Sequence, residues 1–117
     1  SGLTLDQNWS SLILTPPFPA YTSGHSAFGA AGARMIQNLM GTDAVRFKLR
    51  PVDLTWWPDQ LLGTERRYSS IWETAVENGL SRIWGGVHWT FDHDQAMTAG
   101  RGIADEVFQN HFLPVAY

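Results

Sequence analysis

The 117-residue sequence contains no cysteine, which excludes disulfide bonds and thiolate metal sites. It has only one lysine, Lys48, and its 8 basic against 11 acidic residues give a formal charge of −3. No cationic block is present, so nucleic acid is not expected as the main partner. No apolar run approaches the roughly 20 residues that span a bilayer. The chemistry of this chain therefore has to rest on histidine, arginine, hydroxyl and carboxylate side chains.

Hydrophobic residues make up 44% of the chain, which at this length predicts one domain, residues 1–117, with a modest core. Apolar periodicity predicts helices over about 23–40, 67–83 and 92–112, so the fold class is all-α. Between the first two helices, residues 42–67 predict a long ordered loop with a short strand or hairpin arm at 45–49. Glycines at 100 and 102 lie inside the third helix, where they predict close packing.

Apolar residues recur on one face of each predicted helix. In the first helix Phe28, Ala31, Met35 and Leu39 share a face. Residues 27, 30, 31, 32 and 33 are alanine or glycine, so another helix could approach closely there. In the third helix Ala96, Ala99, Ile103 and Val107 lie on adjoining turns.

The first candidate site is Thr22-Ser23-Gly24-His25, at the start of the first predicted helix. Backbone N–H groups at a helix start have no partner within the helix, and glycine lets a ligand approach the backbone. Ser23 adds a hydroxyl donor, and His25 can hold or release a proton near neutral pH. By itself this stretch is better explained by a serine or threonine cap, so an anion site needs support from elsewhere.

The second candidate site lies in SRIWGGVHWTFDHD, residues 81–94. Arg82 and His88 are separated by a glycine pair, and a guanidinium with an imidazole suits a tetrahedral oxyanion. Asp92 follows His88 by four residues, so its carboxylate could bind the far ring nitrogen and fix the tautomer. Asp92 with Gln95 also fits a capping box, and both roles are compatible.

A divalent metal site built from His88, Asp92, His93 and Asp94 is a weaker alternative, because three adjacent side chains cannot easily face one ion. His93 and His111 are predicted to be surface residues.

Taken together, PFPAYTSGH and SRIWGGVHWTFD resemble the second and third signature motifs of the superfamily of vanadium-dependent haloperoxidases and type 2 phosphatidic acid phosphatases. Ser23-Gly24-His25 matches the family's P-S-G-H, and the segment from Ser81 to His88 matches S-R-x-x-x-G-x-H. The resemblance covers essentially the whole chain and implies a helical bundle of the haloperoxidase/acid phosphatase type. The sequence around the motifs favours the haloperoxidase branch.

The resemblance implies a role for each matching residue. His88 would be the axial ligand of vanadate, and Arg82 would bind its oxygens together with Ser23 and the N–H of Gly24. His25 would act as acid and base in catalysis. Hydrogen peroxide and a halide would be the substrates, with a small organic acceptor as a further candidate.

The same family suggests roles for two further residues. Asp92 would support His88. Phe18 occupies the position at which chloroperoxidases of the family carry phenylalanine, which predicts a place in the halide pocket; core packing explains it equally well.

The sequence departs from the family pattern in two places. Thr22 replaces the proline before Ser-Gly-His. The first family motif, Lys-x6-Arg-Pro, is absent, since nothing before Thr22 is lysine or arginine. We therefore expect this chain to form the C-terminal part of the site; whether the missing cations lie upstream in the intact protein stays open.

Two other functions stay open. One is a phosphatase in which phosphate replaces vanadate and His88 carries a phosphoryl group. The other is a non-catalytic fragment with a residual oxyanion site. Family members are often exported or dimeric, which extends the candidate partners to a second copy or the N-terminal half of the same enzyme. The location of this protein stays open.

Overall fold

The structure, a computed structural model, describes residues 4–50, 64–111 and 113. In these ranges the elements, in chain order, are α1 (Gly24–Met40), β1 (Phe47–Leu49), β2 (Arg66–Tyr68), α3 (Ile71–Trp84) and α4 (Thr90–Asn110). The mostly helical class is confirmed. The two strands form an antiparallel hairpin in which Lys48 pairs with Arg67. Thus the predicted loop over 42–67 contains a strand at each end, and its residues 51–63 lie outside the described ranges.

Local side chains fix where the helices begin and end. Ser23 caps α1 by accepting a hydrogen bond from the N–H of Ser26, and Ser70 caps α3 in the same way through Glu73. Gly41 ends α1 in the left-handed conformation, with φ 68°, which glycine adopts without steric cost. The hydroxyl predicted as a cap thus has that role in α1.

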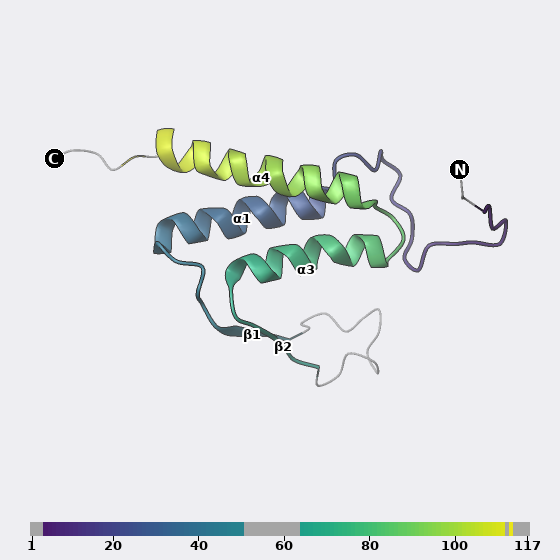
Figure 1. Ribbon diagram of the computed structural model, residues 1–117, viewed down its shortest axis with the longest axis horizontal. Coiled ribbons are helices and arrows are strands. Elements are labelled where there is room, and N and C mark those ends of the chain that lie inside the picture. The colour runs from purple at the N-terminus through teal and green to yellow at the C-terminus, as the bar shows by residue number, and fades with distance from the viewer. Residues whose placement is uncertain (1–3, 51–63, 112, 114–117) are drawn as a thin grey trace.

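Helices α1 and α4 run parallel and side by side, while α3 packs against α1 in the opposite direction (Figure 1). Contact between α1 and α4 is close at Gly100, where a Cβ atom would overlap the carbonyl oxygen of Ala27. Close packing at this glycine is confirmed. At Gly102 no atom lies within 4 Å of the same position, so the prediction for this second glycine is wrong.

The core consists mainly of small side chains. Its central cluster contains Ala30, Ala33, Ile71, Ala75 and Met97.

Several large residues of the predicted apolar helix faces are exposed. Phe28 is 83% exposed, Leu39 69% and Ile103 60%. The reason is that α1 and α4 approach each other along alanine and glycine, which leaves the larger apolar residues outside the contact.

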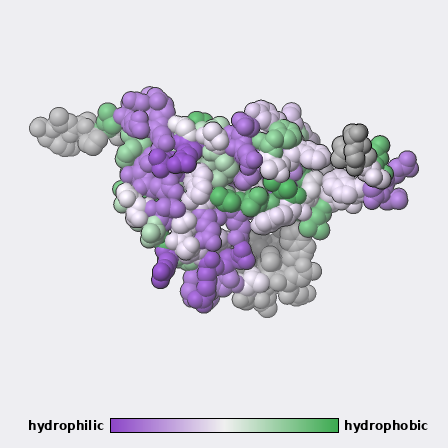
Figure 2. Space-filling view, viewed as in Figure 1, coloured by the Kyte–Doolittle hydropathy of each residue, from purple (hydrophilic) through white to green (hydrophobic). Residues whose placement is uncertain are grey.

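Many large apolar side chains therefore lie on the surface. On the face in Figure 2, apolar groups gather between the middle of the bundle and the end at which α1 and α4 begin, while hydrophilic groups cover the other end and the hairpin. Among the described residues, no helix is both long and apolar enough to cross a membrane.

Candidate active site

The two sequence motifs meet at one end of the bundle. Helices α1 and α4 both begin there, and α3 ends there (Figure 1). A backbone hydrogen bond joins the two helix starts, because the N–H of Ser23 donates to the carbonyl oxygen of Asp92 at 3.3 Å. Segments almost 70 positions apart are thereby brought together, as the anion-site interpretation of both motifs requires.

His88 is held by Asp92. The distance from His88 Nδ1 to Asp92 Oδ2 is 2.7 Å, and the two side chains are 2% and 0% exposed. Asp92 Oδ1 accepts a second hydrogen bond, from the N–H of Trp89 at 2.9 Å, so the carboxylate also caps α4. Because an ionised carboxylate only accepts, Nδ1 of His88 is the donor. In the neutral ring Nε2 is then free of hydrogen and able to act as a ligand or nucleophile.

Arg82 lies in the last turn of α3, and its carbonyl oxygen accepts from the N–H groups of Val87 and His88 at 3.1 and 3.3 Å. Gly86, with φ 78°, supplies the left-handed turn that leads the chain from α3 to His88. The Nε atom of Arg82 is buried and has no hydrogen-bond partner among the described residues. A buried donor without a partner is costly, and an anion would satisfy it.

His25 is exposed, and its environment opposes protonation. Partial burial lowers the pKa of His25 below the ordinary 6.5, and electrostatic interactions with Arg82 and His88 lower it further. This electrostatic coupling indicates that the three side chains face a common region. At Gly24 no atom lies within 4 Å of the position that a Cβ atom would occupy, so the backbone is open to a ligand there.

Two further predicted site residues, Ser23 and Phe18, differ in their exposure. Ser23 has no exposed surface, and its hydroxyl serves the helix cap. Phe18 is 60% exposed, so the core-packing explanation for this residue is wrong.

For one histidine, the predicted exposure is wrong. His93, predicted at the surface, is buried, and its Nδ1 lies 2.8 Å from the hydroxyl oxygen of Ser26 in α1. Sequence reasoning missed this pair because its members are 67 residues apart; the only local signal was a histidine one position after a capping aspartate. His111 is exposed, as predicted. In the described ranges no group of histidine and carboxylate side chains could hold a metal ion, so the divalent-metal alternative finds no support.

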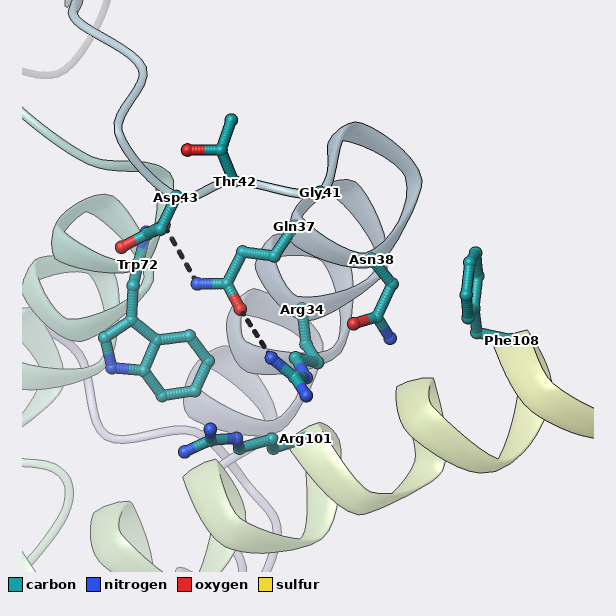
Figure 3. A pocket seen from close by; sticks show the side chains of 9 residues that line it. All are labelled: Arg34, Gln37, Asn38, Gly41, Thr42, Asp43, Trp72, Arg101 and Phe108. Carbon is teal, nitrogen blue, oxygen red and sulfur yellow. Dashed lines mark hydrogen bonds between the residues drawn. The ribbon is translucent and has the colours of Figure 1, made fainter.

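A separate cavity of about 580 Å³ lies at the other end of the bundle, between the end of α1, the start of α3 and the second half of α4 (Figure 3). Its cations already have partners: Arg34 forms an ion pair with Asp105, and the Arg101 guanidinium lies 5.6 Å from the centre of the Trp72 ring. Neither motif contributes a residue to it.

Comparison with known proteins gives a family and several relatives. The family model described as the VCPO second helical-bundle domain matches residues 2–114. Vanadium chloroperoxidase from Curvularia inaequalis is 33% identical over an alignment of 114 residues; the match covers 73% of this chain and 19% of the relative. The chain thus spans about a fifth of the length of this curated relative.

Two crystal structures resemble the fold. A bacterial vanadium-dependent iodoperoxidase has a TM-score of 0.69 and 31% identity, over 85% of this chain and 22% of its own. The holo form of a bacterial vanadium-dependent chloroperoxidase has a TM-score of 0.71 over 89% and 24%. At 23% identity, the second likeness concerns the fold alone.

Proposed function

The chain belongs to the VCPO second helical-bundle domain family, and from this premise we propose that it forms the vanadate-holding part of a haloperoxidase. In this proposal, residues 1–117 are one domain, the C-terminal part of the enzyme. Hydrogen peroxide and a halide are the substrates, and a small organic molecule is a candidate acceptor for the oxidised halogen.

One observation carries the proposal: the Asp92–His88 pair lies at the same end of the bundle as a buried arginine Nε without a partner among the described residues. These groups fit a vanadate ion, since the ring nitrogen of His88 that Asp92 leaves free is a ligand and Arg82 is a donor of fixed charge. When bound, vanadate supplies the site at which hydrogen peroxide is activated toward the halide.

The chain's own residues then have distinct tasks. His88 would hold the ion, and Asp92 would keep the imidazole in the tautomer that allows it. Arg82 and the N–H of Gly24 would orient the oxygens, with Ser23 as a further donor. His25, whose lowered pKa favours the neutral ring at neutral pH, would accept and return the proton of the peroxide. Phe18 is the proposed contact for the halide.

The positive charge that these two motifs supply is too small to hold a vanadate or phosphate ion on its own. Arg82 is the arginine that these motifs supply, and a vanadate or phosphate ion carries more negative charge than one guanidinium neutralises. We infer that further cations come from another segment of the intact protein or from a partner chain. The first family motif, absent before Thr22, would supply them.

The experiment is a halide-oxidation assay on the intact protein with vanadate and hydrogen peroxide, together with titration of inorganic vanadate followed by ⁵¹V NMR. We expect turnover and binding that are both lost in His88→Ala. His111→Ala, which changes an exposed histidine outside both motifs, is the matched control and should behave as wild type. Vanadate binding without oxidation of chloride, bromide or iodide would contradict the peroxidase.

The same groups support a phosphatase as the second candidate, because an imidazole oriented by a carboxylate is also a nucleophile. Hydrolysis of a chromogenic phosphate ester that disappears in His88→Ala would favour it. Weak oxyanion binding without either activity would instead support the non-catalytic fragment.

A further inference from the structure

A buried hydrogen-bond chain connects α4 to the start of α1. The hydroxyl oxygen of Ser26 lies 3.1 Å from that of Ser23 and 2.8 Å from Nδ1 of His93. Ser23 and Ser26 have no exposed surface, and His93 is only 6% exposed. Such a chain is shielded from water, which strengthens each of its hydrogen bonds.

Helix α3 also packs against these hydrogen-bonded side chains, through Gly79. A Cβ atom at this position would overlap the ring of His93 and would lie 2.6 Å from Ser26 Oγ. The missing side chain at Gly79 therefore provides the space that the pair occupies. All three helices fix the geometry of Ser26 and His93.

The donor of each hydrogen bond among Ser23, Ser26 and His93 can be assigned. Ser26 Oγ donates its single hydrogen to Ser23 Oγ, so the hydrogen between Ser26 and His93 comes from Nδ1 of the imidazole. Ser23 Oγ accepts a second hydrogen bond from the N–H of Ser26 at 3.4 Å. With both lone pairs engaged, Ser23 has only its own hydroxyl hydrogen left to give, and within residues 4–50, 64–111 and 113 it donates no hydrogen bond in this arrangement.

We propose that His93 and Ser26 are positioning residues that direct the hydroxyl hydrogen of Ser23 toward an oxyanion at the start of α1. This inference rests on the proposed function and adds two residues to it. Ser23 is followed by the exposed residues Gly24 and His25, so its hydrogen lies next to the open helix start. Since Ser23 has no exposed surface, an oxyanion that binds its hydroxyl would have to displace the groups that cover it.

The hydrogen order is tested without any ligand. We expect ¹⁵N NMR of the protein at neutral pH to place a hydrogen on Nδ1 of His93. A bare Nδ1 would mean that Ser26 donates to the imidazole, which leaves Ser23 free to donate inward to Ser26. That result would overturn the proposal, whether or not the protein binds vanadate.

The effect on the site is tested by the affinity for inorganic vanadate. Ser26→Ala and His93→Phe should each weaken binding about tenfold, the effect of losing one charge-assisted hydrogen bond. Because both residues act through Ser23, neither substitution should weaken binding further when it is added to Ser23→Ala. An equal loss in that background would mean that they act on the fold, which contradicts a positioning role.

Ser70→Ala is the matched control, since it removes the serine cap of α3 outside this chain of hydrogen bonds. It should lower the stability and leave the vanadate affinity unchanged. The two proposals fail in different ways. Wild-type protein that binds no vanadate overturns the proposed function, whereas wild-type binding that Ser26→Ala does not weaken overturns this inference alone.

Discussion

Asp92 accepts a hydrogen bond from His88 across 2.7 Å, between two side chains that are almost completely buried. The same carboxylate caps α4 through the N–H of Trp89, and the backbone carbonyl of the residue receives the N–H of Ser23. One aspartate therefore orients the proposed ligand and fixes where two helices begin. A change at this position should affect both the fold and the site.

We predict that Asp92→Asn lowers the free energy of unfolding by about 2 kcal/mol, because a charge-assisted hydrogen bond in a buried site becomes weaker. It should also weaken vanadate binding, since an amide that donates to Nδ1 of His88 moves the ring hydrogen to Nε2. Urea unfolding and vanadate titration measure the two effects. The control is Asp94→Asn, an exposed neighbour on the same helix, with an expected change within about 0.5 kcal/mol.

The second prediction concerns the protonation of His25. We expect its pKa to lie below 6.5, because partial burial and electrostatic interactions with Arg82 and His88 oppose the imidazolium form. A lowered histidine pKa means that the folded state binds its proton less readily, so this group reduces stability as the pH falls below 6.5. In Arg82→Gln the pKa should rise toward 6.5, as measured by NMR titration. Arg101→Gln, at the distant cavity, should leave it in place.

Alanine substitutions at two glycines of α4 should change the stability in opposite directions. Gly100→Ala should lower stability by roughly 1–3 kcal/mol, because its methyl group would overlap the backbone of α1 at Ala27. Gly102→Ala meets no atom within 4 Å and should raise stability by up to about 1 kcal/mol, through the better helix propensity of alanine. Thermal unfolding of both variants is the measurement. Equal effects would mean that α1 and α4 do not approach closely at Gly100.

The ion pair between α1 and α4 predicts a pH dependence of stability. Hydrogen bonds from Arg34, at 2.6 Å, and from Asn38, at 2.8 Å, lower the pKa of Asp105 below its ordinary 3.8. A lowered carboxyl pKa stabilises the fold above 3.8, and this contribution disappears as the pH falls through the lowered value. The difference in unfolding free energy between wild type and Asp105→Asn should therefore shrink in acid. Glu106→Gln, a neighbour on the same helix, should show no comparable difference at neutral pH.

The positions of the helices were predicted to within a few residues, except that the second was expected from residue 67, whereas residues 66–68 form β2 and α3 begins at Ile71. Ser23 at the start of α1 and Gly41 at its end are residues that cap helices through their own side chain or backbone. The face that each helix buries was predictable only in part. The apolar pattern grouped Phe28 with Leu39, which are exposed, whereas the run of small residues that includes Ala30 and Ala33 correctly indicated where another helix packs closely. Which helix lies opposite decides this, and periodicity carries no information about it.

In the candidate site, too, contacts between residues close in sequence were predictable, and contacts between different helices were not. His88 and Asp92 are four residues apart, so their hydrogen bond could be predicted from spacing alone. His93 could not be placed, because its partner Ser26 belongs to another helix and its space depends on Gly79 of a third. Strand β2 was missed for a related reason: Arg66-Arg67-Tyr68 is short and charged, and only the pairing with β1 makes it a strand.

The parallel arrangement of α1 and α4 has an electrostatic consequence. Each helix carries about half a positive charge at its first turn, so two like helix dipoles begin side by side at the candidate site. Side-by-side dipoles of equal direction repel each other, and α3, which runs the other way, packs mainly against α1. An anion held between the two first turns would relieve this repulsion. If the site binds an oxyanion as proposed, the stability of the bundle should rise with the concentration of that ion, so the ligand would be a component of the fold.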